Sequence, residues 1–150
     1  MLSREELLQR EQQAWAQLVA EVGRVPEHIR SDEGVVPGWS VNDLVFHCGR
    51  WAAVATEHLE AMRTGVPAED NDDPTDTRND RWARESKSMS YENAMASALT
   101  DREGARSALL SLPAIDDEAA SWFTEETFDH YQEHTEEISR FADSLGVPEK

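Results

Sequence analysis

His130 and His134 are the residues in this sequence whose type and spacing are best suited to chemistry. They stand four residues apart in TFDHYQEHTEEI, within a segment of helical periodicity. In an α-helix this spacing puts two side chains one turn apart and about 40° around the axis, so both imidazoles can reach one ion. The pair therefore offers two nitrogen ligands of the kind that zinc and other divalent metals accept.

A third histidine, His47, lies beside the apolar seam of an earlier helical segment, formed by Leu44, Cys48 and Trp51. It is expected to face the interior and to meet the pair across a helix interface. Three imidazoles from two helices leave coordination positions open to water or substrate, as catalytic sites require. The sequence therefore predicts a metal site made of His47, His130 and His134.

An alternative hypothesis treats these histidines as core residues, each with one satisfied hydrogen bond. Burial of three such groups near one another without a shared ligand would leave ring nitrogens without partners. Four charged residues flank the predicted ligands and would orient a ligand or meet a substrate, or serve only as caps and solvated side chains. They are Asp43, Arg50, Asp129 and Glu133.

The remaining histidines and the single cysteine are expected to have no part in this site. His58 follows His47 by eleven residues, which is roughly 16 Å along a helix, so it cannot bind the same ion. His28 falls in a loop. Cys48 is the only cysteine, which excludes an internal disulfide, and it is expected to be a small buried residue rather than a nucleophile.

Four segments with helical periodicity must position these residues. No segment alternates with period two, so the predicted fold is all-α, a four-helix bundle in one domain over residues 1–150. The predicted helices run from after Ser3 to Gly23, from Val41 to Gly65, from after Ser90 to Leu112, and from about Glu125 to Leu145. The last helix is expected to follow a loop that extends to about Phe123 and to be capped by Thr124.

Residues 66–88 are predicted to form a long connection between the second and third helices, with at most a short helix over Arg81 to Lys87. The acidic part of this segment does not match a calcium-binding EF-hand loop. Counted from Asp70, the sixth position is Thr75 instead of glycine, and the twelfth is Arg81 instead of glutamate.

Charge and hydropathy restrict the partners. The chain has 31 acidic and 14 basic residues, a formal net charge of -17, and no long basic cluster, so nucleic acid and anionic membranes are not expected partners. No stretch approaches the ~20 apolar residues of a membrane span, and a cytoplasmic location is expected. Trp82 and Trp122 lie outside the apolar seams, which suggests a homodimer.

Two motifs, PGWSVNDLVFHCGRWA and TFDHYQEHTEEI, resemble those of the DinB-like superfamily. The nearest branch is that of the mycothiol-dependent maleylpyruvate isomerase metal-binding domains. The resemblance implies a four-helix bundle with up-down-down-up connections, which would account for the long connection after the second helix. It also implies that one histidine from the second helix and two from the fourth bind a divalent metal, and these correspond to His47, His130 and His134.

The resemblance further implies an enzyme that uses a low-molecular-weight thiol such as mycothiol, bacillithiol or glutathione. A metal, with zinc or nickel favoured, would coordinate the thiol sulfur and present it to a small electrophile for S-transfer or isomerisation. Because the isomerases carry a further C-terminal domain, their particular reaction is not expected here. Two alternatives stay open, a metal-dependent hydrolase and a non-catalytic module that binds a metal or small ligand.

Overall fold

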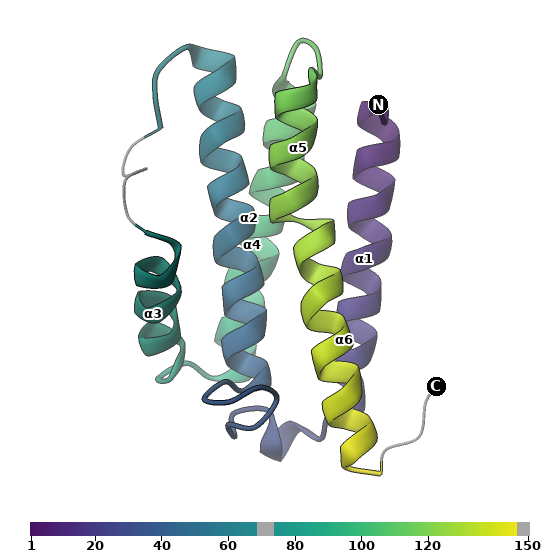
Figure 1. Ribbon diagram of the computed structural model, residues 1–150, viewed down its shortest axis with the longest axis vertical. Coiled ribbons are helices and arrows are strands. Elements are labelled where there is room, and N and C mark those ends of the chain that lie inside the picture. Colours follow the sequence, from purple (N-terminus) through teal and green to yellow (C-terminus); the bar gives the residue numbers. More distant parts are fainter. Residues whose placement is uncertain (69–73, 147–150) are drawn as a thin grey trace.

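The structure, a computed structural model, describes residues 1–68 and 74–146, and its elements are helices (Figure 1). The helices are α1 (Arg4–Arg24), the short 3₁₀ helix η1 (Glu27–Ile29), α2 (Val41–Thr64), α3 (Thr75–Ser86), α4 (Tyr91–Ser111), α5 (Asp117–Glu126) and α6 (Phe128–Ser144). The described residues contain no strand, only one isolated bridge between Val36 and Trp39. The prediction of an all-α fold is therefore confirmed.

The long helices lie side by side in Figure 1, with α3 as a short outer helix beside α2. In that view α1 runs down the page, α2 and α4 run up, and α5 and α6 run down in succession. Within the described part of the chain, no helix is long and apolar enough to cross a membrane.

Helix α2 begins and ends where the sequence predicts. Ser40 and Asp43 form a reciprocal capping box, in which each side chain accepts a hydrogen bond from the other residue's backbone N–H. Gly65, with a φ of 76°, ends the helix in the left-handed conformation that glycine adopts without a steric penalty. These two ends fix the register of α2.

Helices α2 and α4 approach each other closely at a glycine. A Cβ atom on Gly49 would lie 2.7 Å from the Cα of Ala98, so no larger residue fits without a shift of the helices. His47 precedes Gly49 by two residues and points about 200° away around the helix axis. The side of α2 opposite α4 therefore carries His47.

A buried carboxylate joins three helices. Glu11 of α1 is fully buried and accepts hydrogen bonds from Arg102 Nε (2.9 Å), Arg102 Nη2 (2.5 Å) and Arg106 Nη1 (2.9 Å) of α4. Tyr131 of α6 donates its hydroxyl to the same carboxylate at 3.0 Å. Burial raises the pKa of Tyr131 well above its usual value, so the hydroxyl keeps its proton and acts as a donor.

The prediction for the start of the last helix is wrong. Residues 117–126, expected to be mainly loop, form α5, because the Asp116 side chain accepts from the Ala119 N–H and caps this helix. Thr124 caps nothing and lies inside α5. The chain breaks at the buried Thr127, whose hydroxyl donates to the Phe123 carbonyl at 2.6 Å, and α6 follows from Phe128.

The connection between α2 and α4 contains more structure than predicted. Helix α3 starts at Thr75 and not at Arg81, and it buries Arg78, Trp82 and Ser86, which stand four residues apart along one face. Residues 69–73, which include most of the acidic stretch compared with an EF-hand, lie outside the described residues.

The tryptophans that suggested a homodimer are covered within the chain. Trp82 is buried and packs edge-to-face against Trp51, with ring centroids 5.2 Å apart. Trp122 is partly buried and stacks on His58. These two tryptophans therefore do not form an exposed aromatic surface that would favour a homodimer.

We expect Glu11→Gln to lower the free energy of unfolding by about 3–5 kcal/mol, because it leaves two arginines beside a neutral side chain in the interior. Tyr131→Phe removes a single hydrogen bond and should lower it by about 1–2 kcal/mol. Urea denaturation at neutral pH measures both. Glu136→Gln, at an exposed position of α6, is the control and should change stability by less than about 0.5 kcal/mol. A loss below about 1 kcal/mol for Glu11→Gln would contradict this role.

Candidate functional site

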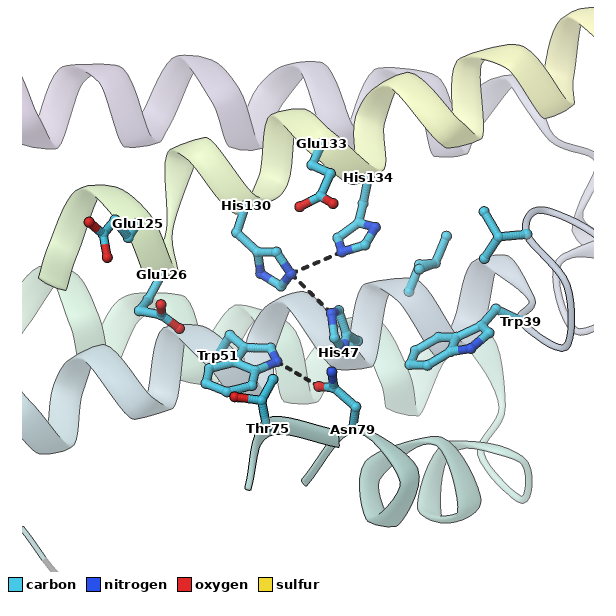
Figure 2. Close-up of a pocket in the computed structure, with 12 residues that line it drawn as sticks. Trp39, His47, Trp51, Thr75, Asn79, Glu125, Glu126, His130, Glu133 and His134 are labelled. Atoms are coloured by element: carbon cyan, nitrogen blue, oxygen red, sulfur yellow. Dashed lines mark hydrogen bonds between the residues drawn. The ribbon is translucent and has the colours of Figure 1, made fainter. Parts of the chain in front are cut away.

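The structure brings together the three histidines that the sequence predicted. His47 Nε2 of α2 lies 3.0 Å from His130 Nε2 of α6, and His134 Nε2 lies 2.9 Å from the same His130 atom. One ligand nitrogen from each residue lies within 4.8 Å of the other two. Figure 2 shows the three rings pointing toward one another across the α2–α6 interface.

Burial favours the neutral form of two of the rings, those of His47 and His130. His47 is only 6% exposed, and burial followed by the charge of His134 lowers its pKa to about 3. Burial lowers the pKa of His130 to about 2, and the charges of His134 and then His47 act in the same direction. A neutral imidazole keeps one nitrogen lone pair available for an ion.

The ring nitrogens fit a shared cation better than hydrogen bonds among themselves. His130 Nε2 faces two other Nε2 atoms, and a neutral ring has at most one proton to place there. The Nδ1 atoms of His47 and His130 are buried and have no hydrogen-bond partner. Nitrogens bound tetrahedrally to one zinc ion at 2.0–2.1 Å lie about 3.3 Å apart. The two separations from His130 Nε2, 3.0 and 2.9 Å, are a few tenths of an ångström shorter.

Glu137 orients the third ring. Its carboxylate is hydrogen-bonded to His134 Nδ1 one turn away on α6. With the Nδ1 proton held by a carboxylate, Nε2 of His134 is left as the acceptor that faces the other rings. Glu137 was not among the flanking acids predicted from the sequence, which were Asp129 and Glu133. Its spacing of three residues from His134 is the signal that could have found it, because residues three apart on a helix can touch.

A cavity of about 430 Å³ opens beside the three rings. Its lining includes Val36, Trp39, Leu44 and Trp51, with Thr75 and Asn79 of α3. In Figure 2, Trp39 lies at one end, and Trp51 and Thr75 lie toward the other. Trp51 Nε1 donates to Asn79 Oδ1 at 2.9 Å, which fixes the indole relative to α3 (Figure 2). The volume is that of a pocket for a small molecule.

Three glutamates, Glu125, Glu126 and Glu133, also line this cavity. Burial, and next the charge of Glu125, raise the pKa of Glu126 to about 7, while Arg78 acts in the opposite direction. The helix predicted from about Glu125 to Leu145 would have put Glu125 and Glu126 in its first turn. They stand instead at the end of α5, where the break at Thr127 turns them toward the pocket.

Asp43 and Arg50 are engaged elsewhere. Besides its role as a cap, Asp43 accepts hydrogen bonds from Ser86 Oγ at 2.5 Å and Lys87 Nζ at 2.6 Å. Arg50 forms a bidentate ion pair with Asp101 of α4, with Nη2 2.6 Å from Oδ1. Asp129 is exposed and does not line the cavity.

Cys48, His58 and His28 lie apart from the three rings. Cys48 is fully buried, and burial raises the pKa of its thiol far above the usual value, which disfavours a nucleophilic thiolate. His58 stacks on Trp122 with ring centroids 3.6 Å apart, and burial lowers its pKa. His28 is exposed on η1.

Comparison with known proteins identifies the family. Residues 8–131 match the mycothiol maleylpyruvate isomerase N-terminal domain. The chain belongs to this family. The family is DinB-like and metal-binding, and His47 and His130 lie inside the matched range, whereas His134 lies just beyond it.

Among solved structures, the chain is similar to an uncharacterised protein from Escherichia coli UTI89. The TM-score is 0.81 at 16% sequence identity, and the match covers 97% of this chain and 96% of the other. This likeness shows that the two share a fold. No curated protein matches the sequence.

The lowered histidine pKa values predict how acid affects the metal-free protein. Below about pH 6.5 the unfolded chain binds protons at His47 and His130 that the folded chain does not bind. Stability should therefore fall as the pH is lowered from 6.5, by up to about 1.4 kcal/mol per pH unit for each histidine. Urea denaturation between pH 7 and pH 5, with a chelator present, measures this slope.

The substitution His130→Gln should make that slope shallower, because one of the two titrating rings is lost. His28→Gln, at an exposed position, is the matched control and should leave the slope unchanged. Equal slopes for wild type and His130→Gln would contradict the assignment of buried, neutral histidines.

Proposed function

We propose that His47, His130 and His134 hold one divalent metal ion, and that the protein is a metal-dependent enzyme using a low-molecular-weight thiol of the mycothiol type. The reaction would be S-transfer to, or isomerisation of, a small electrophile. The observation that carries this proposal is the convergence of three histidine Nε2 atoms beside a cavity. Zinc and nickel both accept imidazole ligands of this kind.

A divalent ion bound here would favour the thiolate form of the thiol. The side chains of the protein would position the reactants. Glu137 holds His134 in the tautomer whose Nε2 is free to bind the ion. The hydrogen bond from Trp51 to Asn79 fixes the indole that lines the cavity. Because Cys48 is buried and its thiol is hard to ionise, the attacking sulfur would come from the cosubstrate and not from the protein.

The family supports the choice of thiol, since its name joins mycothiol to an isomerase. The size of the cavity supports a small-molecule partner. We also propose a cytoplasmic location, where low-molecular-weight thiols are kept reduced. Light scattering would measure whether the chain also forms the homodimer that the sequence analysis suggested.

Metal analysis tests the site. We expect about one divalent ion per chain in the purified protein and a sharp reduction in His134→Ala, because the ligand set falls from three imidazoles to two. Glu137→Ala keeps the ligands and should weaken metal affinity by roughly 10–100-fold. His58→Ala is the control and should retain the metal. Full retention of metal in His134→Ala would refute the assignment.

A thiol-consumption assay tests the reaction. Metal-loaded protein is mixed with mycothiol, bacillithiol or glutathione and a generic electrophile, and loss of free thiol is followed with time. We expect metal-dependent consumption with at least one thiol, abolished by chelation and by His47→Ala. Metal binding without thiol consumption under any of these conditions would favour a binding module over an enzyme.

A further inference from the structure

One polar side chain of the cavity wall is held in a single orientation by its neighbour. Asn79 of α3 lines the cavity, and its Oδ1 accepts a hydrogen bond from Trp51 Nε1 at 2.9 Å. An indole nitrogen can only donate, so the atom that meets it must be the carboxamide oxygen and not the nitrogen. The contact with Trp51 therefore fixes which way the amide is turned, and the NH₂ group of Asn79 faces away from the indole nitrogen.

The nitrogen of this carboxamide has no protein partner among the described residues. In that part of the chain, the contact with Trp51 is the one hydrogen bond of the Asn79 side chain. The buried polar side-chain atoms that lack a partner there belong to other residues, so Nδ2 of Asn79 is accessible. Figure 2 shows the carboxamide with its nitrogen on the side of His47. Two N–H donors are thus available to a molecule in the cavity.

The amide is held firmly because the surrounding contacts hold both Trp51 and α3. The Trp51 ring packs edge-to-face against Trp82, with centroids 5.2 Å apart, and the buried guanidinium of Arg78 lies 5.9 Å from its centroid. At the end of α3, Ser86 Oγ donates to Asp43 Oδ1 of α2 at 2.5 Å. A donor that is in position before a ligand arrives loses little freedom on binding, so its hydrogen bond can discriminate between ligands.

Asn79 and the histidines face one cavity from different helices. The Trp51 ring centroid lies 6.5 Å from that of His130, so the amide that meets Trp51 and the three Nε2 atoms can contact the same small molecule. An amide N–H is satisfied by an acceptor oxygen, such as that of a carbonyl group. A carboxylate is less suited to this wall, because the described lining residues include three glutamates and neither lysine nor arginine.

We propose that Asn79 is a specificity-determining residue whose Nδ2 donates a hydrogen bond to an uncharged carbonyl oxygen, so that the small molecule bound in the cavity is a neutral carbonyl compound. The assignment of this molecule as the electrophile rests on the proposed thiol-dependent function. Its binding does not, because Asn79 and Trp51 need no metal to present the donor. A ligand without the oxygen displaces water from Nδ2 and leaves the donor unpaired, so it loses affinity.

Three probes of similar shape test the role of Asn79. Acetophenone has an uncharged carbonyl, ethylbenzene has a methylene group in its place, and benzoate has a carboxylate. Each is titrated into the purified protein in the presence of a chelator. Binding is followed by NMR through the indole N–H resonance of Trp51, assigned with Trp51→Phe, and the side-chain N–H resonances of Asn79, assigned with Asn79→Ala.

Two variants with the same chemical change are compared with the wild type. Asn79→Asp keeps an oxygen that can accept from Trp51 Nε1 and loses the N–H donors. Asn93→Asp, at an exposed position of α4, is the matched control. Thermal denaturation first shows whether both are folded, and Asn79→Ala takes the place of Asn79→Asp if that variant is not.

Asn79→Asp is expected to weaken the binding of acetophenone about tenfold, as the loss of one hydrogen bond to a desolvated carbonyl does, and to change that of ethylbenzene by less than about twofold. Asn93→Asp should change neither. In the wild type, benzoate should bind at least about tenfold more weakly than acetophenone. The proposal is overturned if acetophenone shows no saturable binding, if Asn79→Asp leaves its affinity unchanged or weakens both neutral probes equally, or if benzoate binds as tightly as acetophenone.

These results can be separated from those that test the proposed function. Retention of metal in the wild type, together with no effect of Asn79→Asp on acetophenone, would remove the role of Asn79 and leave the metal site standing. Binding of acetophenone that depends on Asn79, in a protein that retains no metal, would establish this donor and remove the metal-dependent reaction.

Discussion

The carboxylate of Glu11 sets the orientation on which the rest of the structure depends. It is fully buried, so it needs partners, and it finds them on two other helices: Arg102 and Arg106 of α4, and Tyr131 of α6. The contact with Tyr131 restricts rotation of α6 about its own axis. Because His130 is the preceding residue, it points about 100° away from Tyr131 and therefore toward α2. The contact between Glu11 of α1 and Tyr131 of α6 thus helps to orient the histidines of α6 toward α2.

The opposite side of the site is set by close packing. Gly49 allows α2 to approach Ala98 of α4, and the capping box of Ser40 and Asp43 fixes where α2 begins. His47 lies on the opposite side of α2 and points toward His130, with the two Nε2 atoms 3.0 Å apart. The positions of the three ring nitrogens therefore depend on two independent contacts. One is the polar contact of Tyr131 with Glu11, and the other is the close packing of Gly49 on Ala98. Such convergence places neutral polar atoms where they lack hydrogen-bond partners, and the buried Nδ1 atoms of His47 and His130 show this directly.

Much of this could be predicted from the sequence, because the relevant signals are local. The start of α2 at Val41, its end at Gly65, and the inward positions of His47, His130 and His134 follow from caps and helical periodicity. What could not be predicted depends on contacts made by the folded chain. Helix α3 has few apolar residues, and its burial comes from the packing of Trp82 on Trp51. The break at Thr127, inside the helix predicted from about Glu125 to Leu145, separates α5 from α6 and leaves Glu126 at the end of α5, in the cavity wall.

The break at Thr127 also separates two tasks within a short stretch of chain. After it, α6 carries two of the three histidines and Glu137, which orients one of them. Before it, α5 contributes carboxylates that line the cavity without hydrogen bonds to the described histidines. The histidine geometry is fixed by the core through Tyr131, whereas Glu125 and Glu126 are not tied to that core contact. Substitutions at the end of α5 can therefore change the charge of the cavity while the three ring nitrogens keep their positions, so a chain of this family can differ in the molecules it accepts without a change in its histidines.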